Sequence, residues 1–157
     1  MYQPRTPGFT KRDPVKRWAV PDRVFFACGS CHILAHAFLE RYGTPEHEVT
    51  WIKPAAGYWG NHIFVSAADW VFDFHGYSRR ESFLSHVWKR SRTLWPGWDA
   101  TLVAFPRDLL ISEAKSKAFG CWLAEPWQFL HDPIPRARQY LDRFPAPGEI
   151  ESQFASP

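Results

Sequence analysis

The stretch FFACGSCHILAHAFLERYG, residues 25–43, decides how the rest of the chain is interpreted. Apolar side chains recur at helical spacing from the second cysteine onward, and Gly43 followed by Pro45 is typical of a helix end. Ser30 is the expected N-cap. We therefore predict a helix from Ser30 to Tyr42, with the segment ACGS forming the turn that leads into it.

This predicted helix has two different sides. On a helical wheel Cys31 lies on the wide apolar side, in the first turn, and so points into the protein. His32, His36 and Glu40 fall together on the other side and are expected to point away from the core. A thiol at a helix N-terminus faces unpaired backbone N–H groups and the positive end of the helix dipole, which favour the thiolate. Cys31 is therefore either a nucleophile or a small buried residue at a crowded helix start.

The stretch GNHIFVSAADWVFDFHG, residues 60–76, predicts two short strands around a two-residue turn at Ala67 and Ala68. In that register His62 and Asp73 lie opposite one another on the same face, with Cβ atoms ~5 Å apart. A carboxylate there can accept the imidazole N–H and stabilise the imidazolium. Asp73 also interrupts an aromatic and β-branched run, where an unpaired carboxylate would be costly. The hairpin thus predicts a His62–Asp73 pair.

The rest of the chain contains further predicted strands and helices. We predict strands at 48–53 and 101–105, a loop at 55–61, and helices at 81–92, 107–119 and 136–144. One helix, then strands, then helices is typical of an α+β fold, with the helices on one side of a small antiparallel sheet.

Composition excludes several classes of protein. The 157 residues carry a formal charge of +3, and their basic residues are interspersed with acids, unlike a nucleic-acid footprint. No apolar run is long enough to span a membrane, and the N-terminus lacks a signal-type apolar region. Three cysteines without an export signal indicate reduced thiols, so we expect a cytoplasmic protein that binds neither nucleic acid nor membrane.

The segment ACGSCHILAHAF resembles the nucleophile helix of papain-like cysteine proteases, which carry CGSCW with the second cysteine catalytic. In this chain a Cys is followed by a His at the start of one strand and by an Asp on the next strand. This order is similar to that of the catalytic residues in the transglutaminase-like branch, which includes arylamine N-acetyltransferases. Small bacterial and phage papain-fold proteins share this pattern. Over residues 25–76 the resemblance implies that Cys31 is the nucleophile, His62 the general base and acid, and Asp73 the residue that orients His62.

The resemblance further implies a cysteine hydrolase or acyl-transfer enzyme: a peptidase, amidase or deamidase acting on an amide or thioester carbonyl. The substrate would be a protein, a peptide or a small acyl donor, and no cofactor or metal is needed. Phe25 stands where papain has its oxyanion glutamine, so the Cys31 N–H would be one oxyanion donor and Asn61 or Trp59 the other. The aromatic residues expected to flank the cleft are Trp51, Tyr58, Trp59 and Trp70.

We expect three segments: an extended N-terminal arm over 1–22, a single catalytic domain over 23–145 and a flexible tail over 146–157. His75 and His86 are expected at the surface or at the rim of the site, and Cys121 in the core.

Three other motifs overlap the cysteine helix. CxxCH matches the haem-attachment signature, but no export signal is visible and Met1 is the only methionine. Cys28 and Cys31 form a CxxC that would serve a thiol–disulfide redox protein if RVFFA were a strand. His32, His36 and Glu40 have zinc-ligand spacing, but Ile33 stands where a metalloprotease needs glutamate. A non-catalytic protein-interaction module on the same scaffold is the remaining alternative.

Overall fold

The computed structural model describes residues 12–154. Its centre is a five-stranded antiparallel sheet with the order β4-β3-β2-β1-β5. The strands are β1 (Glu48–Pro54), β2 (His62–Ala67), β3 (Trp70–Asp73), β4 (Gly76–Arg79) and β5 (Ala100–Ala104). The predicted α+β class with a small antiparallel sheet is confirmed. The short edge strand β4 was not predicted, because the sequence GYSR has no apolar alternation.

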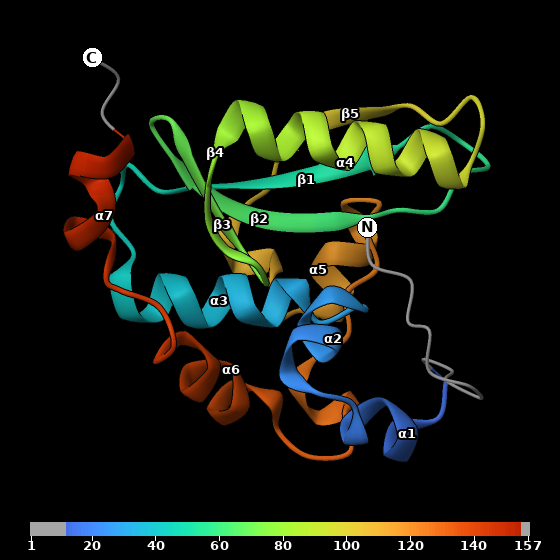
Figure 1. The fold of residues 1–157 in the computed structure, drawn as a ribbon. Coiled ribbons are helices and arrows are strands. Elements are labelled where there is room, and N and C mark those ends of the chain that lie inside the picture. The colour runs from blue at the N-terminus through green and yellow to red at the C-terminus, as the bar shows by residue number, and fades with distance from the viewer. Residues whose placement is uncertain (1–11, 155–157) are drawn as a thin grey trace.

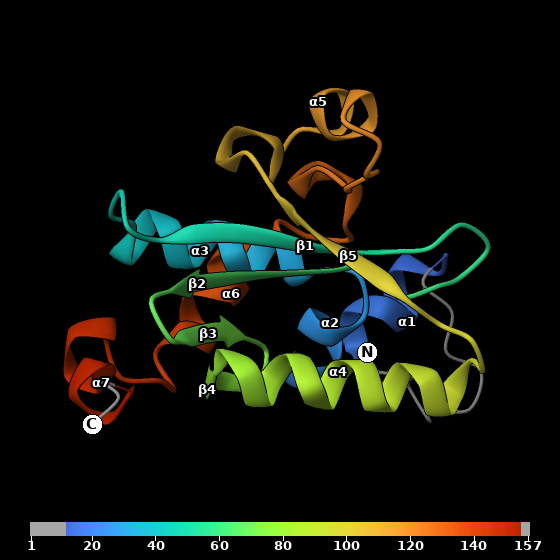
Figure 2. The same ribbon diagram turned by 90° about the horizontal axis from the view of Figure 1, so that it is seen from above.

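Helices cover both faces of the sheet (Figure 1). The long helix α4 (Arg80–Leu94) lies on one face, and α3 (Cys31–Tyr42) lies on the other, with α6 (Pro133–Leu141) packed behind it. Figure 2 shows α4 beside the β3–β4 end of the sheet and α5 (Glu113–Ala118) at the β5 end. The remaining helices are α1 (Pro14–Ala19), α2 (Asp22–Ala27), α7 (Pro147–Phe154) and the 3₁₀ turns η1 (Arg107–Leu109) and η2 (Pro126–Gln128).

The expectation that all helices lie on one side of the sheet is wrong, because the strands are apolar on both faces. Ile63 and Phe72 face α3, where Phe72 stacks on Phe38 with ring centroids 4.7 Å apart. Phe64 and its neighbours on the opposite face form a second buried cluster with α4, made up of Ile52, Phe64, Val71, Phe83, Val87 and Trp98. A sheet buried on both sides holds β2 and β3 firmly, and these strands carry the predicted His–Asp pair.

The hairpin register differs from the prediction by two residues. The turn occupies Ala68 and Asp69, with Ala68 in the left-handed region at φ 46°, and Ser66 pairs with Val71. A shift of two residues keeps every side chain on its predicted face, whereas a shift of one would reverse them all. Asp73 therefore lies diagonally across from His62 rather than directly opposite.

The helix predicted at 30–42 is confirmed as α3, and that predicted at 81–92 as α4, which is longer by a residue or two at each end. The single helix predicted over 107–119 is wrong. It is divided into η1 and α5, because the Ser112 side chain accepts a hydrogen bond from the Lys115 N–H and starts a new helix there. RVFFA is not a strand; it belongs to α2.

The described parts of the predicted arm and of the predicted tail both contain helix. Within the predicted extended arm, residues 14–19 form α1, whose N-cap Asp13 accepts from two backbone N–H groups, and α2 crosses the predicted boundary at 22–23. Residues 1–11 lie outside the described part. The predicted flexible tail contains α7, which buries Ile150. Within residues 12–154, no helix combines the length and apolar character that a bilayer span requires.

Candidate active site

Cys31 is the first residue of α3, and its position follows from the turn before it. Gly29 has φ 92°, a conformation that residues with a Cβ atom rarely adopt, so glycine is required for this turn. Ser30 is fully buried and does not cap the backbone; instead the Arg17 guanidinium donates to its hydroxyl at 3.2 Å and to the Gly29 carbonyl at 2.8 Å. A residue from α1 thus holds the turn that presents Cys31.

His62 and Asp73 form a direct pair, as the hairpin predicts. His62 Nε2 lies 3.0 Å from the Asp73 carboxylate, and both residues are buried, with 7 % and 4 % of their surface exposed. The other carboxylate oxygen accepts the His75 backbone N–H at 2.8 Å and lies 3.2 Å from His75 Nδ1. Because the carboxylate only accepts, Nε2 of His62 carries the proton of this hydrogen bond.

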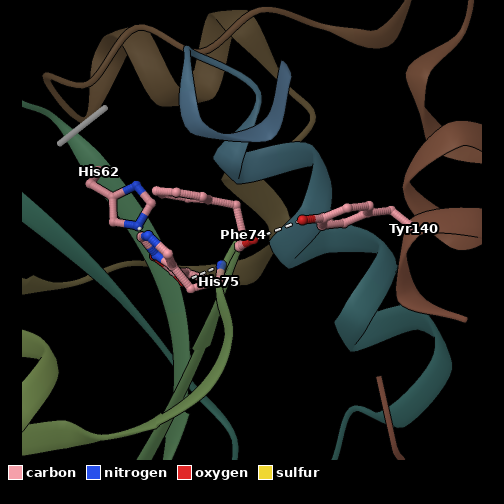
Figure 3. A network of polar contacts seen from close by, with 5 residues as sticks. His62, Phe74, His75 and Tyr140 are labelled. Carbon is pink, nitrogen blue, oxygen red and sulfur yellow. Dashed lines mark hydrogen bonds and ion pairs between the residues drawn. The ribbon is translucent and has the colours of Figure 1, made fainter. Parts of the chain in front are cut away.

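The turn behind this pair is anchored to α6. The Tyr140 hydroxyl donates to the Phe74 carbonyl at 2.8 Å, one residue after Asp73 (Figure 3). The Phe74 ring also meets the His62 imidazole edge-on, with centroids 5.6 Å apart. The carboxylate is therefore fixed by its own backbone neighbours and by a helix from the opposite layer, which is the preorganisation that a catalytic acceptor needs.

Cys31 and His62 line the same cleft and are close enough to shift each other's pKa. Burial by itself disfavours the thiolate, but hydrogen bonds from His32 and His62 outweigh burial and hold the pKa of Cys31 well below its usual value. Burial likewise disfavours the imidazolium, yet Asp73 and the Cys31 sulfur raise the pKa of His62 to about 9. The Asp73 carboxyl is buried too, but His62 and His75 keep its pKa far below the ordinary range. These shifts favour a thiolate–imidazolium pair.

His32 is placed differently from the prediction. It is 1 % exposed rather than pointing away from the core, and its Nε2–H donates to the Ala124 carbonyl at 2.9 Å. Among the described residues, its buried Nδ1 has no hydrogen-bond partner, and His32 contributes to the low pKa of Cys31. The segment after α5 covers this side of the helix, which the helical wheel alone cannot show. His32 is thus a site residue that the sequence did not reveal.

A cleft of about 990 Å³ opens in front of the sulfur. Cys31, half-buried, lines it together with His62 and Asn61. The Asn61 side-chain carbonyl accepts the Trp51 indole N–H at 2.8 Å. Since an indole N–H only donates, this bond fixes which end of the amide is oxygen and leaves the Asn61 NH₂ group free for the cleft. The Asn61 amide therefore offers a hydrogen-bond donor at the cleft.

Tryptophans form much of the cleft wall. Trp59 is 76 % exposed and lines the cleft as predicted; Trp95 and Trp122, which were not predicted, line it too, and Trp122 is 59 % exposed. The Trp122 indole is held by the Glu113 carboxylate at 2.7 Å. The sequence does not indicate that these two tryptophans line the cleft, because they come from loops that are distant in sequence from the cysteine helix.

Three predicted cleft residues lie elsewhere. Trp70 is buried at the far end of β3, against Phe38, so its assignment to the cleft is wrong. Tyr58 does not line the cleft; it packs against the α4 cluster, and its hydroxyl donates to the Pro96 carbonyl. Trp51 is buried and does not line the cleft. Its indole N–H donates to Asn61, which does line it.

Cys28 and Cys121 are buried, and neither is part of a disulfide. Cys28 ends α2, with its backbone N–H bonded into that helix. Cys121 lines the cleft, although it was expected simply in the core, and burial followed by the charge of Cys31 raises its pKa to about 12. Cys121 therefore does not compete with Cys31 as a thiolate at neutral pH.

The zinc-spaced residues do not converge. His32 points to Ala124, whereas His36 Nε2 lies 3.7 Å from the Glu40 carboxylate on the outer side of α3. Within the described residues, no three His, Cys, Asp or Glu side chains are grouped to hold a metal ion.

Compared with known proteins, the chain matches no family model, no curated protein and no solved structure.

Proposed function

We propose that this protein is a cysteine-dependent hydrolase or acyl-transfer enzyme, acting on an amide or thioester carbonyl through Cys31, His62 and Asp73. One observation carries the proposal: the Cys31 thiol at the start of α3 and the His62 imidazole line the same cleft and shift each other's pKa, and His62 Nε2 lies 3.0 Å from the buried Asp73 carboxylate. A cysteine helix packed on a small antiparallel sheet supports a papain-like or transglutaminase-like core.

The proposed reaction has two halves. The Cys31 thiolate attacks the carbonyl carbon, and the oxyanion that forms accepts hydrogen bonds from the Cys31 backbone N–H and the Asn61 amide. The carbon–nitrogen or carbon–sulfur bond then breaks as the His62 imidazolium gives its Nδ1 proton to the leaving group. In the second half His62 removes a proton from water or an acceptor amine, which attacks the thioester and releases Cys31.

The cleft favours a substrate with a large flat or aliphatic group next to the reacting carbonyl. Trp59, Trp95 and Trp122 supply apolar surface around the sulfur, and indole faces stack well on planar groups. A protein or peptide side-chain amide, or a small aromatic acyl donor, meets this requirement. Hydrolysis of a peptide or isopeptide-type amide is the activity that we propose first, followed by deamidation and acyl transfer.

The proposed role of the Asn61 amide as an oxyanion donor can be tested separately by mutation. Replacing Asn61 with alanine removes one donor and should lower kcat by about 10²–10³-fold, with a smaller effect on KM. Trp51→Phe should give a weaker effect of the same kind, because it only releases the Asn61 amide from its fixed orientation. Steady-state kinetics with an activated ester check both. An Asn61→Ala variant with unchanged kcat would remove Asn61 from the oxyanion site.

Trapping an acyl-enzyme tests the proposed function directly. The full chain is mixed with p-nitrophenyl acetate and with a panel of thioesters, and its intact mass is followed from the first seconds. We expect a single acyl group, located on Cys31 by peptide mapping, that disappears as product is released. Acylation spread over surface lysines, with none on Cys31, would instead support the non-catalytic interaction module.

A reversible Cys28–Cys31 disulfide would support the redox alternative. The same samples, run with and without reductant, distinguish it by the loss of two hydrogens from the intact mass. The structure shows no disulfide between Cys28 and Cys31, and Cys28 is buried at the end of α2.

A further inference from the structure

The strand β5 forms one border of the sheet (Figure 2). It pairs with β1 on one side, and within residues 12–154 no strand pairs with its other side. A border strand offers unpaired backbone N–H and C=O groups to a second strand. The sequence ATLVA contains no charged residue and no proline, and its pairing with β1 runs without a bulge. β5 therefore lacks the features that usually keep a border strand from pairing.

The opposite border, β4, is protected. It ends in the charged residue Arg79 and leads directly into α4. The segment after α6 also lies against it: a Cβ atom built on Gly76 would be 2.7 Å from the Phe144 ring, and the Tyr77 hydroxyl donates to the Pro145 carbonyl. One border of the sheet is thus covered by the chain itself, whereas the β5 border is open.

The hydrogen bonds between β5 and β1 determine which backbone groups of β5 point outward. Asp99 and Phe105, at the two ends of the strand, are hydrogen-bonded to β1 with N–O distances of 2.8 and 2.9 Å. In an antiparallel pair, alternate residues turn both backbone groups toward the same neighbouring strand. The residues that turn theirs away from β1 are therefore Ala100, Leu102 and Ala104.

These outward residues are symmetric about Leu102. If a second copy approaches antiparallel with Leu102 opposite Leu102, Ala100 lies opposite the partner's Ala104, and outward residues meet outward residues throughout. The Leu102 residues then exchange both of their hydrogen bonds, and each Ala104 N–H meets the partner's Ala100 carbonyl. The Ala100 N–H is already engaged, because the Trp88 indole and then this N–H lower the pKa of Asp99. A register shifted by one residue would put outward residues opposite inward ones.

The border also has room for a second strand. Leu102 is 40 % exposed and lies directly opposite Ile52, which belongs to the α4 cluster. A hollow of about 620 Å³ beside the strand is lined by Leu102, Ala104 and Phe105, and Arg80 is the only α4 residue among its described lining residues. Helix α4 therefore does not extend over this part of the border, and the apolar Leu102 side chain is left at the surface.

The two ends of β5 carry opposite charges. Asp99 precedes the strand and Arg107 follows it, and both residues are exposed. An antiparallel pair of β5 strands brings the Asp99 end of each copy to the Arg107 end of the other. A parallel pair would instead bring like charges together at both ends. Charge complementarity therefore favours a two-fold arrangement.

From these observations we propose that β5 is a self-association surface, through which two copies of this chain pair antiparallel about a two-fold axis at Leu102. The pairing joins the two five-stranded sheets into one and closes on itself, because each copy contributes the same border. A single short strand makes a small interface, so the dimer should dissociate on dilution. No residue of β5 lines the cleft of Cys31, so the proposal is independent of the acyl chemistry.

Sedimentation velocity of the full chain, from dilute solution to its solubility limit, tests the proposal. We expect a reversible equilibrium between monomer and dimer. Amide hydrogen exchange followed by NMR should show protection of Leu102 and Ala104 that grows with concentration, whereas Thr101 and Val103, already bonded to β1, should not change. A chain that stays monomeric at every concentration would overturn the proposal and leave this border to a different partner. Protection confined to another surface would also overturn it.

Charge-swap variants test the register. Leu102→Lys and Leu102→Glu should each weaken the dimer by at least about 10-fold, because an apolar contact is lost and like charges face each other across the axis. An equimolar mixture of the two should associate again, since opposite charges then meet. A mixture that stays monomeric would refute the pairing of Leu102 with itself, as would either single variant if it dimerised like the parent chain.

Thr101→Glu is the matched control. It adds the same charge one residue away, opposite Lys53 of the same chain, and it faces the partner's Val103 instead of a second glutamate. We expect a clearly smaller loss of association than for Leu102→Glu. Both positions are exposed, so circular dichroism and the Tm should match the parent chain. Equal losses at both positions would show only a general charge effect and contradict the proposed register.

Discussion

Replacing Cys31 with alanine is expected to abolish acyl-enzyme formation and to lower hydrolysis of p-nitrophenyl acetate by roughly 10⁴-fold or more. The reason is that no other described thiol can take over. Cys28 is buried at the end of α2, and burial raises the pKa of Cys121 to about 12. Cys31 is small and half-buried, so the fold should survive its replacement. Intact mass and initial rates measure the effect, with circular dichroism as the check on folding.

Cys28→Ala is the matched control for this variant. It removes a thiol three residues away and should retain acylation, with at most a modest loss of stability from the small cavity that it creates. An active Cys31→Ala protein beside an inactive Cys28→Ala protein would reassign the nucleophile to Cys28.

Replacing Asp73 with asparagine should have the second-largest effect, a loss of about 10³–10⁴-fold in turnover with little change in substrate binding. The carboxylate accepts the His62 Nε2–H and stabilises the imidazolium, and it helps raise the pKa of His62 to about 9. Asparagine keeps the shape but lacks the charge, and its NH₂ group favours the wrong imidazole tautomer. The pKa of His62 should therefore fall, which histidine NMR measures alongside kcat and KM.

His75→Gln is the control for the charge around Asp73. The His75 backbone N–H still donates to the carboxylate in this variant, and only the ring contact is lost. We expect a loss of less than about 10-fold, since a partly exposed side-chain contact contributes little. If Asp73→Asn turned over substrate as fast as the parent chain, Asp73 would have no part in the mechanism.

Local pattern was enough to predict the elements that carry the proposed triad. Helix α3 follows from its apolar spacing and from Gly43, and β2 and β3 follow from their apolar and β-branched runs. The hairpin turn was misplaced by one residue, which moved the pairing by two. Because side chains alternate along a strand, the error in register left His62 and Asp73 on the same face.

The features that the sequence did not predict depend on contacts between distant segments. His32 looks exposed on a helical wheel, but the chain around Ala124 packs over it, and the Ala124 carbonyl accepts a hydrogen bond from its ring. Asn61 was proposed as a donor, yet its orientation comes from Trp51 on the neighbouring strand. Trp95 and Trp122 reach the cleft from loops without periodicity, which give no signal of their location.

The central claim is that Cys31 and His62 form a thiolate–imidazolium pair, and the pH dependence of Cys31 alkylation by iodoacetamide tests it most directly. With the pKa of Cys31 lowered, the thiolate is present above that low value, so alkylation should already be fast at about pH 6. Deprotonation of His62 should produce a second change in rate near pH 9. An alkylation rate that instead rises as a single step near pH 8.5, the ordinary range of a free thiol, would contradict the pair.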